Sequence, residues 1–223
     1  MKTKLLTIAM MVAFIMTAMT KVQAQNFEGP CLPYAHGLNG HQSAFCGSTE
    51  TQTVQLIAGT NWFSTYLDIT LDDLKAALRE ALPGAANRSI VIKSQNDGQC
   101  QNIAATWGGS LRALDVKQMY KITVPADCEI TLEGMPIDPA ELTFTIVNGI
   151  NWIGFPLQEE MTVTNAFAGF PAKNDIVKSQ SNGQAKWNNT IWTGALKKLV
   201  PGKGYVYNSV ATENKPFVYP SAK

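Results

Sequence analysis

The sequence predicts an α+β protein, rich in strands, built from two tandem copies of one small β-α-β-β-β domain with one helix each. Three observations predict this class: short motifs that recur in the same order, runs rich in β-branched and aromatic residues, and an amphipathic segment in each copy. The chain has 223 residues, of which 45% are hydrophobic and 16% charged, an ordinary composition for a globular protein. Composition by itself indicates no activity.

The recurrence is carried by four motifs that keep their order along the chain. The matched segments are 59–62 with 149–152, 93–95 with 178–180, 107–111 with 192–196, and Tyr120 with Tyr205. The first pair is offset by 90 residues and the others by 85, which one deletion of five residues explains. We therefore expect a first copy at 51–134 and a second at 140–223.

Each copy is expected to begin with a strand and a helix. Residues 54–67 predict a strand interrupted at Gly59. Thr70 and Asp73 form a capping box before leucines spaced three and four residues apart, which predicts an amphipathic helix. The missing five residues fall in the matching stretch around Phe167, so the second helix is expected to be about one turn shorter.

A hairpin should follow in each copy. Strands at 89–95 and 99–105 are joined through an Asp-Gly pair at 97–98, and the second copy has Asn-Gly at 182–183. Both dipeptides favour a type I′ turn, whose two central residues have positive φ.

The end of each copy predicts one or two further strands, at 119–132 and 204–218. Between the copies, 135–139 contains two prolines in five residues and predicts a short, stiff linker. The Pro-Gly pair at 201–202 predicts a type II turn, because the spacing of a phosphate-binding loop is missing.

Residues 1–24 have the features of a secretory signal peptide. A positive start at 1–4 precedes an apolar run at 5–19 and a small-residue cleavage site that ends at Ala24. The run is too short to span a bilayer. We expect cleavage near Ala24 and a mature chain without a membrane span that is secreted, periplasmic or held at the cell surface.

The four cysteines are expected to form disulfides, because an exported protein meets an oxidising compartment. Cys100 and Cys128 both lie in the first copy, and the second copy has neither, which favours pairing them with each other. Cys31 and Cys46 then close an irregular leader at 25–50. No spacing is typical of a metal site.

Residues shared by both copies are expected to serve the fold, and unshared residues are free to serve function. The matched tryptophans therefore predict core or hairpin packing. Trp187 is unmatched, since its counterpart is Asn102. Strand alternation would place Trp187 and Asn189 on one face, so that with Asn188 they form a candidate sugar-binding site. The interpretation that we favour for Trp187 is a repacked core or a domain contact.

Charge and motifs exclude several classes of function. Without the three lysines of the signal peptide, the chain has 15 basic and 17 acidic residues, which lacks the excess that nucleic-acid binding needs. The acid pair at 72–73 starts a helix, where the macrodipole favours it, and the pair at 159–160 starts a polar segment. A glycosidase pair separated in sequence stays open. We expect no enzyme activity, no cofactor and no metal.

The motifs G-x-N-W, K-S-Q, W-x-G-x-L and P-G-K-G-Y resemble a repeat of exported surface proteins of Bacteroidetes, and cover most of the chain after residue 50. The resemblance implies export to the cell surface or beyond and no assigned activity. We expect a non-catalytic, adhesin-like or surface-complex protein that binds a protein or a surface glycan. The alternatives are a glycan-binding module using Trp187, Asn188 and Asn189, and an exported hydrolase of unrecognised type.

Overall fold

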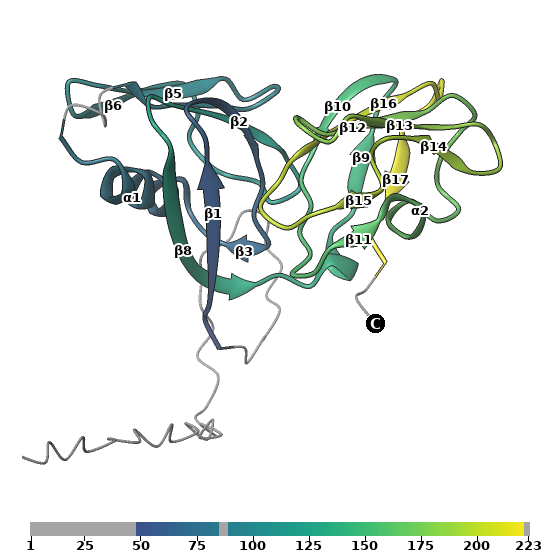
Figure 1. The fold of residues 1–223 in the computed structure, drawn as a ribbon, viewed down its shortest axis with the longest axis horizontal. Coiled ribbons are helices and arrows are strands. Elements are labelled where there is room, and N and C mark those ends of the chain that lie inside the picture. Colours follow the sequence, from purple (N-terminus) through teal and green to yellow (C-terminus); the bar gives the residue numbers. More distant parts are fainter. Residues whose placement is uncertain (1–47, 85–88, 221–223) are drawn as a thin grey trace, which may run out of the picture. The chain divides into compact units, whose positions relative to one another are not determined.

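The structure is a computed structural model that describes residues 48–84 and 89–220, which belong to a single unit. It is rich in strands and has few helices, which confirms that part of the predicted fold class (Figure 1). The predicted signal peptide, the leader and its cysteines Cys31 and Cys46 lie outside the described residues. Within the described ranges, no helix is long and apolar enough to cross a membrane.

We call residues 48–136 the first half and residues 139–220 the second half. The first half contains β1 (Glu50–Leu56), β2 (Gly59–Phe63), β3 (Leu67–Asp68), α1 (Leu71–Ala81), β4 (Val91–Lys93), β5 (Gln99–Ile103), β6 (Thr106–Gly109), β7 (Tyr120–Val124) and β8 (Cys128–Pro136). The second half contains a 3-10 helix η2 (Pro139–Glu141), β9 (Phe144–Ile146), β10 (Gly149–Ile153), β11 (Met161–Thr162), α2 (Val163–Ala166), β12 (Ile176–Lys178), β13 (Gln184–Trp187), β14 (Trp192–Gly194), β15 (Lys198–Leu199), β16 (Tyr205–Ser209) and β17 (Lys215–Phe217).

Two five-stranded antiparallel sheets dominate the architecture. Sheet 1 has the order β2-β7-β4-β5-β6, and sheet 2 has the order β10-β16-β12-β13-β14. Smaller sheets are formed by β1-β8-β3, by β9 with β17 and by β11 with β15. Along β7, buried and half-buried residues alternate, so one face of sheet 1 covers a core and the other faces outward.

Each half buries its own cluster of apolar side chains. The first cluster is mainly aliphatic and includes Leu71, Leu74 and Leu78 of α1, which lies beside β8 (Figure 1). The second cluster is rich in aromatic rings, and its Phe217 and Tyr219 ring centroids are 4.6 Å apart in an edge-on arrangement. In the second half, aromatic side chains therefore supply bulk that a long helix supplies in the first.

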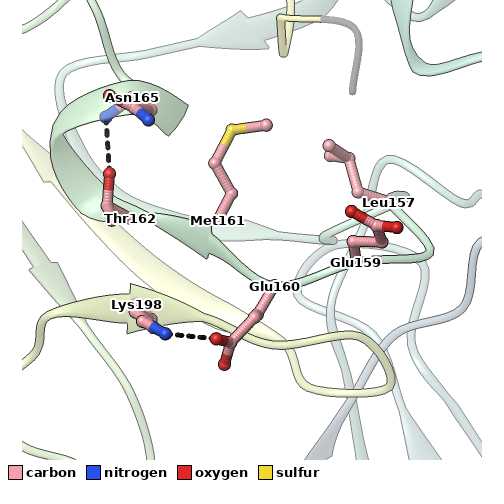
Figure 2. Close-up of a pocket in the computed structure, with 7 residues that line it drawn as sticks. All are labelled: Leu157, Glu159, Glu160, Met161, Thr162, Asn165 and Lys198. Atoms are coloured by element: carbon pink, nitrogen blue, oxygen red, sulfur yellow. Dashed lines mark hydrogen bonds and ion pairs between the residues drawn. The ribbon is translucent and has the colours of Figure 1, made fainter. Parts of the chain in front are cut away.

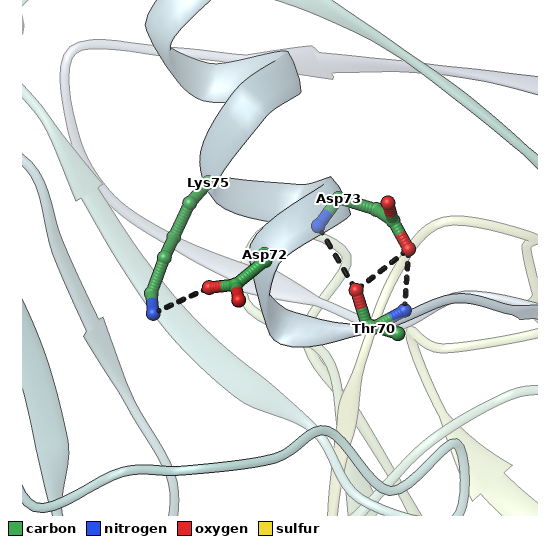
Figure 3. Close-up of polar contacts among 4 residues, drawn as sticks. All are labelled: Thr70, Asp72, Asp73 and Lys75. Atoms are coloured by element: carbon green, nitrogen blue, oxygen red, sulfur yellow. Dashed lines mark hydrogen bonds and ion pairs between the residues drawn. The ribbon is translucent and has the colours of Figure 1, made fainter. Parts of the chain in front are cut away.

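The capping box of α1 is present as predicted (Figure 3). The Thr70 hydroxyl accepts the Asp73 N–H (3.2 Å), and the Asp73 carboxylate accepts the Thr70 N–H (2.8 Å). Asp72 pairs with Lys75 at 3.0 Å. The acid pair at 72–73 therefore starts a helix, where Asp73 satisfies one free backbone donor.

The second helix is shorter than predicted. Helix α1 has 11 residues and α2 has four, a difference of seven residues or about two turns rather than one. Thr162 caps α2 by accepting the Asn165 N–H (3.2 Å), but the helix ends at Ala166 because Phe167 leaves the helical conformation (φ −113°, ψ 31°).

The β4–β5 hairpin differs from the predicted two-residue turn. Its connection is 94–98, closed by the Ser94 N–H, which donates to the Gly98 carbonyl (2.9 Å). The Ser94 hydroxyl accepts the Asp97 N–H (2.6 Å), and the matched hairpin at 179–183 repeats both contacts. Only the glycine of each turn has a positive φ, 85° and 76°, so the type I′ prediction was wrong. The serine hydroxyl stabilises a longer turn instead.

The ends of the two halves follow the prediction more closely. Each final segment contains two strands, β7 and β8 in the first half and β16 and β17 in the second. Gly202 has a φ of 80° and the Lys203 N–H donates to the Val200 carbonyl (3.3 Å), as the predicted type II turn requires. The predicted linker begins too early, because Met135 and Pro136 still belong to β8, where they pair with β3.

Matched asparagines explain why both G-x-N-W motifs contain this residue. Asn61 accepts the Ile57 N–H (2.9 Å) and donates to the Ile57 carbonyl (2.8 Å), and Asn151 makes both contacts with Val147 at the same distances. Both side chains are buried. Each asparagine therefore fixes the bend that leads into β2 or β10 by satisfying backbone groups that have no strand partner.

Cys100 and Cys128 are not bonded to each other in the structure. Cys100 is buried on β5, and Cys128 is half-buried at the start of β8, in a different sheet. Burial raises the pKa of both thiols, which favours their neutral form. The predicted Cys100–Cys128 disulfide stays a prediction.

Candidate functional site

The predicted sugar site at Trp187 does not form one strand face. Strand β13 ends at Trp187, and Asn188 and Asn189 belong to the turn that follows. Asn189 has a φ of 89°, so the alternation that would align it with Trp187 stops there. The Asn188 side chain accepts two backbone N–H groups of the same turn, from Thr190 and Ile191, both at 2.9 Å.

Trp187 itself is half-buried rather than fully exposed. Its ring centroid lies 5.6 Å from that of Trp192, which in turn packs against the second cluster. The three predicted residues are therefore brought together on one hairpin, with the indole used in packing and the Asn188 amide oxygen used by the turn.

The four matched tryptophans fall into two groups. Trp107 and Trp192 pack against the apolar clusters of their halves, which confirms the packing role predicted for them. Trp62 and Trp152 belong to neither cluster and lie on the outward faces of β2 and β10. Sequence reasoning did not separate these two groups, because both pairs are equally conserved between the halves of the chain.

Lys121 joins the two outward indoles. Its Nζ lies 5.7 Å from the Trp62 ring centroid and 4.3 Å from the Trp152 ring centroid. Both distances are within the range of a cation–π interaction. Because Trp62 is in the first half and Trp152 in the second, one ammonium group contacts aromatic rings of both.

A glutamine of the first half holds the edge strand β10 of the second. The Gln95 side-chain amide donates to the Ile150 carbonyl (2.8 Å), and its oxygen accepts the Trp152 N–H (2.5 Å). Ile150 and Trp152 expose these groups at an edge of sheet 2, where no further strand pairs with them. The glutamine side chain therefore completes hydrogen bonds that a neighbouring strand would otherwise make.

Gln180 makes the reciprocal contact from the second half to β2. Its oxygen accepts the Trp62 N–H (2.6 Å), and its amide nitrogen donates to the Thr60 carbonyl. Gln95 and Gln180 occupy the same position of the K-S-Q motif. The glutamine of the K-S-Q motif therefore supplies a contact between the halves in both directions.

Backbone contacts repeat the reciprocity. The Gly204 N–H donates to the Trp62 carbonyl (3.1 Å), and the Met119 N–H donates to the Trp152 carbonyl (3.3 Å). The remaining matched contacts are Ser64 N–H to the Gly202 carbonyl and Gly154 N–H to the Lys117 carbonyl, with bridges Phe63–Lys203 and Gln118–Ile153. We call these backbone contacts, together with the contacts of Gln95 and Gln180, the seam.

Lys203 contacts the first half of the chain through both its side chain and its backbone. Its Nζ donates to the Gln55 carbonyl of the first half (3.2 Å), and its own carbonyl accepts the Ser64 hydroxyl (2.7 Å). Burial lowers the pKa of Lys203. The lysine of the P-G-K-G-Y motif therefore contacts the other half of the chain.

Charge is segregated on the two large sheets. Their ten strands contain four lysines and no aspartate or glutamate. The lysines are Lys93, Lys121, Lys178 and Lys186. By contrast, β1 and β8 carry Glu50, Glu129 and Glu133.

The second acid pair borders a small pocket of about 240 Å³ (Figure 2). Glu160 forms an ion pair with Lys198 on the neighbouring strand β15. Figure 2 shows Glu159 pointing away from this pair, beside Leu157. The two carboxylates therefore do not converge on one point, as a glycosidase pair on adjacent residues would need to do.

One buried acid was missed by sequence reasoning. Asp175 is 1% exposed and accepts hydrogen bonds from the Tyr207 hydroxyl (2.7 Å) and from the N–H groups of Val210 and Ala172 (2.8 Å each). Burial, and then the hydrogen bond to Asp175, raise the pKa of Tyr207. The residue that matches Asp175 in the first half is Ile90, so the recurring motifs did not indicate a buried acid at this position. Because three hydrogen-bond donors satisfy its carboxylate, Asp175 has a structural role in the core of the second half.

Comparison with protein-family models, with curated proteins and with solved structures finds no match to this chain. Among the described residues, no group of three or more histidine, cysteine or acidic side chains is placed to hold a metal ion. The surface around the seam is the candidate functional site that the geometry offers.

Proposed function

We propose that this chain is an exported, non-catalytic interaction protein built from two tandem copies of one β-α-β-β-β unit, at 51–134 and 140–223. The equivalent strand orders of sheets 1 and 2 support the duplication. It is further supported by the identical contacts of Asn61 and Asn151. The reciprocal contacts that Gln95 and Gln180 make with the opposite halves support it as well. Export follows from the signal-peptide features of residues 1–24.

The observation that carries the proposal is the seam. Its hydrogen bonds join the edge strands β2 and β10 to the opposite halves, so the outward residues of both strands belong to one surface. Ile150 is 46% exposed on that surface and lies beside the half-buried indole of Trp152. A broad, pre-organised face of this kind suits recognition of a partner, because little conformational entropy is lost on binding.

The partner is a protein or a surface glycan, met outside the cytoplasm at the cell surface, in the periplasm or after release. Glycan binding at Trp187 is the less favoured arrangement, because its indole and the Asn188 amide already serve the hairpin.

Site-specific photo-crosslinking on intact cells tests the proposal. A photoreactive phenylalanine analogue is placed at Ile150 on the outward face, and the matched control carries it at the exposed Glu129 on β8. We expect a crosslinked partner from position 150 and none from position 129.

Equal yields from both positions, or none from either, would contradict a binding role for this face. Turnover of a chromogenic substrate panel by the purified chain, lost when one carboxylate is changed, would contradict the non-catalytic assignment.

A further inference from the structure

Two rows of side chains cross the outward face and meet at the seam. In sheet 1, Trp62 on β2 lies opposite Lys121 on β7, which lies opposite Lys93 on β4. In sheet 2, the matching row runs from Trp152 through a valine to Lys178. We call these five tryptophan and lysine residues the Trp-Lys face. It has indoles at its centre and lysines toward both ends.

The cation–π contacts with Trp62 and Trp152 account for Lys121, but Lys93 and Lys178 have no such contact among the described residues. Lys93 and Lys121 are directly opposite each other on neighbouring strands, about 5 Å apart at Cβ, and like charges in such a pair destabilise a sheet. None of the ion pairs among the described residues involves Lys93, Lys121 or Lys178. An anion bound between them would relieve this repulsion.

Two acids close in the chain to the sheet 1 row are already engaged. Asp97, in the β4–β5 turn, accepts a hydrogen bond from the Gln118 side chain (3.0 Å). Asp115, before β7, lies 3.8 Å from Lys117. The mature chain carries a small excess of acid, yet the strands of both large sheets carry only positive charge. The local potential of this face is therefore positive on a protein that is not basic overall.

We infer that the Trp-Lys face binds an acidic polysaccharide. The inference rests on the proposed function and specifies its partner. The parts of the two indoles that the Lys121 ammonium does not cover offer apolar surface to the C–H groups of sugar rings. The lysines pair with carboxylate or sulfate groups on the same polysaccharide chain. A nucleic acid fits less well, because its dense phosphates call for more cations than these rows supply.

Binding of the purified mature chain to two pairs of polymers tests the inference. Polygalacturonate is compared with its fully methyl-esterified form, and dextran sulfate with dextran, so that each pair differs only in charge. We expect binding to one acidic polymer or both, weakened by salt, and none to the neutral partners. The first pair identifies carboxylate recognition and the second identifies sulfate recognition.

Variants locate the site. Lys121→Gln and Lys93→Gln should each weaken binding up to about fivefold, as an exposed charge pair does. Trp152→Ala should weaken it about tenfold, with its melting curve recorded to confirm folding. The matched control is Lys75→Gln, which removes an ammonium 5.8 Å from the Trp107 ring on another part of the surface. It should leave the affinity unchanged.

Four outcomes would overturn the inference. These are equal binding of the neutral and acidic polymers, loss of binding in Trp187→Ala but not in Lys121→Gln, tighter binding of single-stranded DNA than of either acidic glycan, and no binding to any polymer. In the last case, a protein crosslinked from position 150 would leave the proposed function standing without its glycan partner. If that crosslink is absent as well, both the inference and the proposed function are contradicted.

Discussion

Removing one glutamine of the seam tests the central structural argument. In Gln95→Ala, the Ile150 carbonyl loses its donor (2.8 Å) and the Trp152 N–H loses its acceptor (2.5 Å). The net contribution of a hydrogen bond is about 0.5–1.5 kcal/mol, so two bonds contribute about 1–3 kcal/mol to stability. For a chain of this size, that corresponds to a fall in melting temperature of roughly 2–12 °C.

Urea unfolding followed by tryptophan fluorescence measures this loss, because Trp62 and Trp152 lie at the seam. The matched control is Gln184→Ala, an exposed glutamine on β13 with no side-chain hydrogen bond among the described residues. It should change the free energy of unfolding by no more than about 0.5 kcal/mol. Gln180→Ala should resemble Gln95→Ala, since its contacts are the reciprocal ones.

Gln95→Glu sharpens the test. The carboxylate still accepts the Trp152 N–H, but it places an oxygen where an amide donor faced the Ile150 carbonyl. This variant should therefore remain less stable than the unmodified chain. If Gln95→Ala and Gln184→Ala unfold at the same urea concentration with the same slope, the glutamine contacts do not stabilise the protein and the argument from the seam fails.

Three further outcomes are expected. Ala105→Gly should stabilise the chain by about 1 kcal/mol in urea unfolding, because Ala104 and Ala105 have φ of 49° and 70° in the β5–β6 turn, and a loss of stability would contradict strain there. Gly154→Ala should destabilise it by more than about 2 kcal/mol in the same assay, because an added Cβ would lie 2.3 Å from the Val116 carbonyl oxygen, and a neutral effect would contradict so close an approach. Burial raises the pKa of Tyr205 to about 12, above the value of 10.0 for a free side chain, so its contribution to stability is complete below pH 10 and is lost as the pH rises to about 12. Tyrosine absorbance during a pH titration should show delayed ionisation, and full ionisation near pH 10 in the folded chain would contradict it.

Local signals in the sequence predicted the local structure well. Thr70 and Asp73 predicted the start of α1, and the leucine spacing predicted its buried face. Both depend on residues three or four apart, which sequence inspection can assess. The type I′ prediction was wrong for an equally local reason, because the Ser94 hydroxyl accepts the Asp97 N–H and stabilises a longer turn.

Contacts between distant residues could not be predicted in this way. Gln95 contacts residues 55 and 57 positions further along the chain, and no periodicity reports such a pairing. The recurrence of the K-S-Q motif marked Gln95 and Gln180 as shared, and hence as structural, but it did not indicate which residues they contact. The expectation that unshared residues serve function does not hold for Trp187, because this unshared residue packs against Trp192.

The reciprocity of the seam has a consequence for how the protein assembles. The glutamine contacts and the backbone contacts of the seam are matched by the same contacts in the opposite direction, which is the rule of an isologous dimer. On the proposed duplication, a single unit carries both the glutamine and the edge strand that receives it, so it is self-complementary. Covalent tethering then fixes the effective concentration of the two partners. Their pairing is therefore independent of dilution.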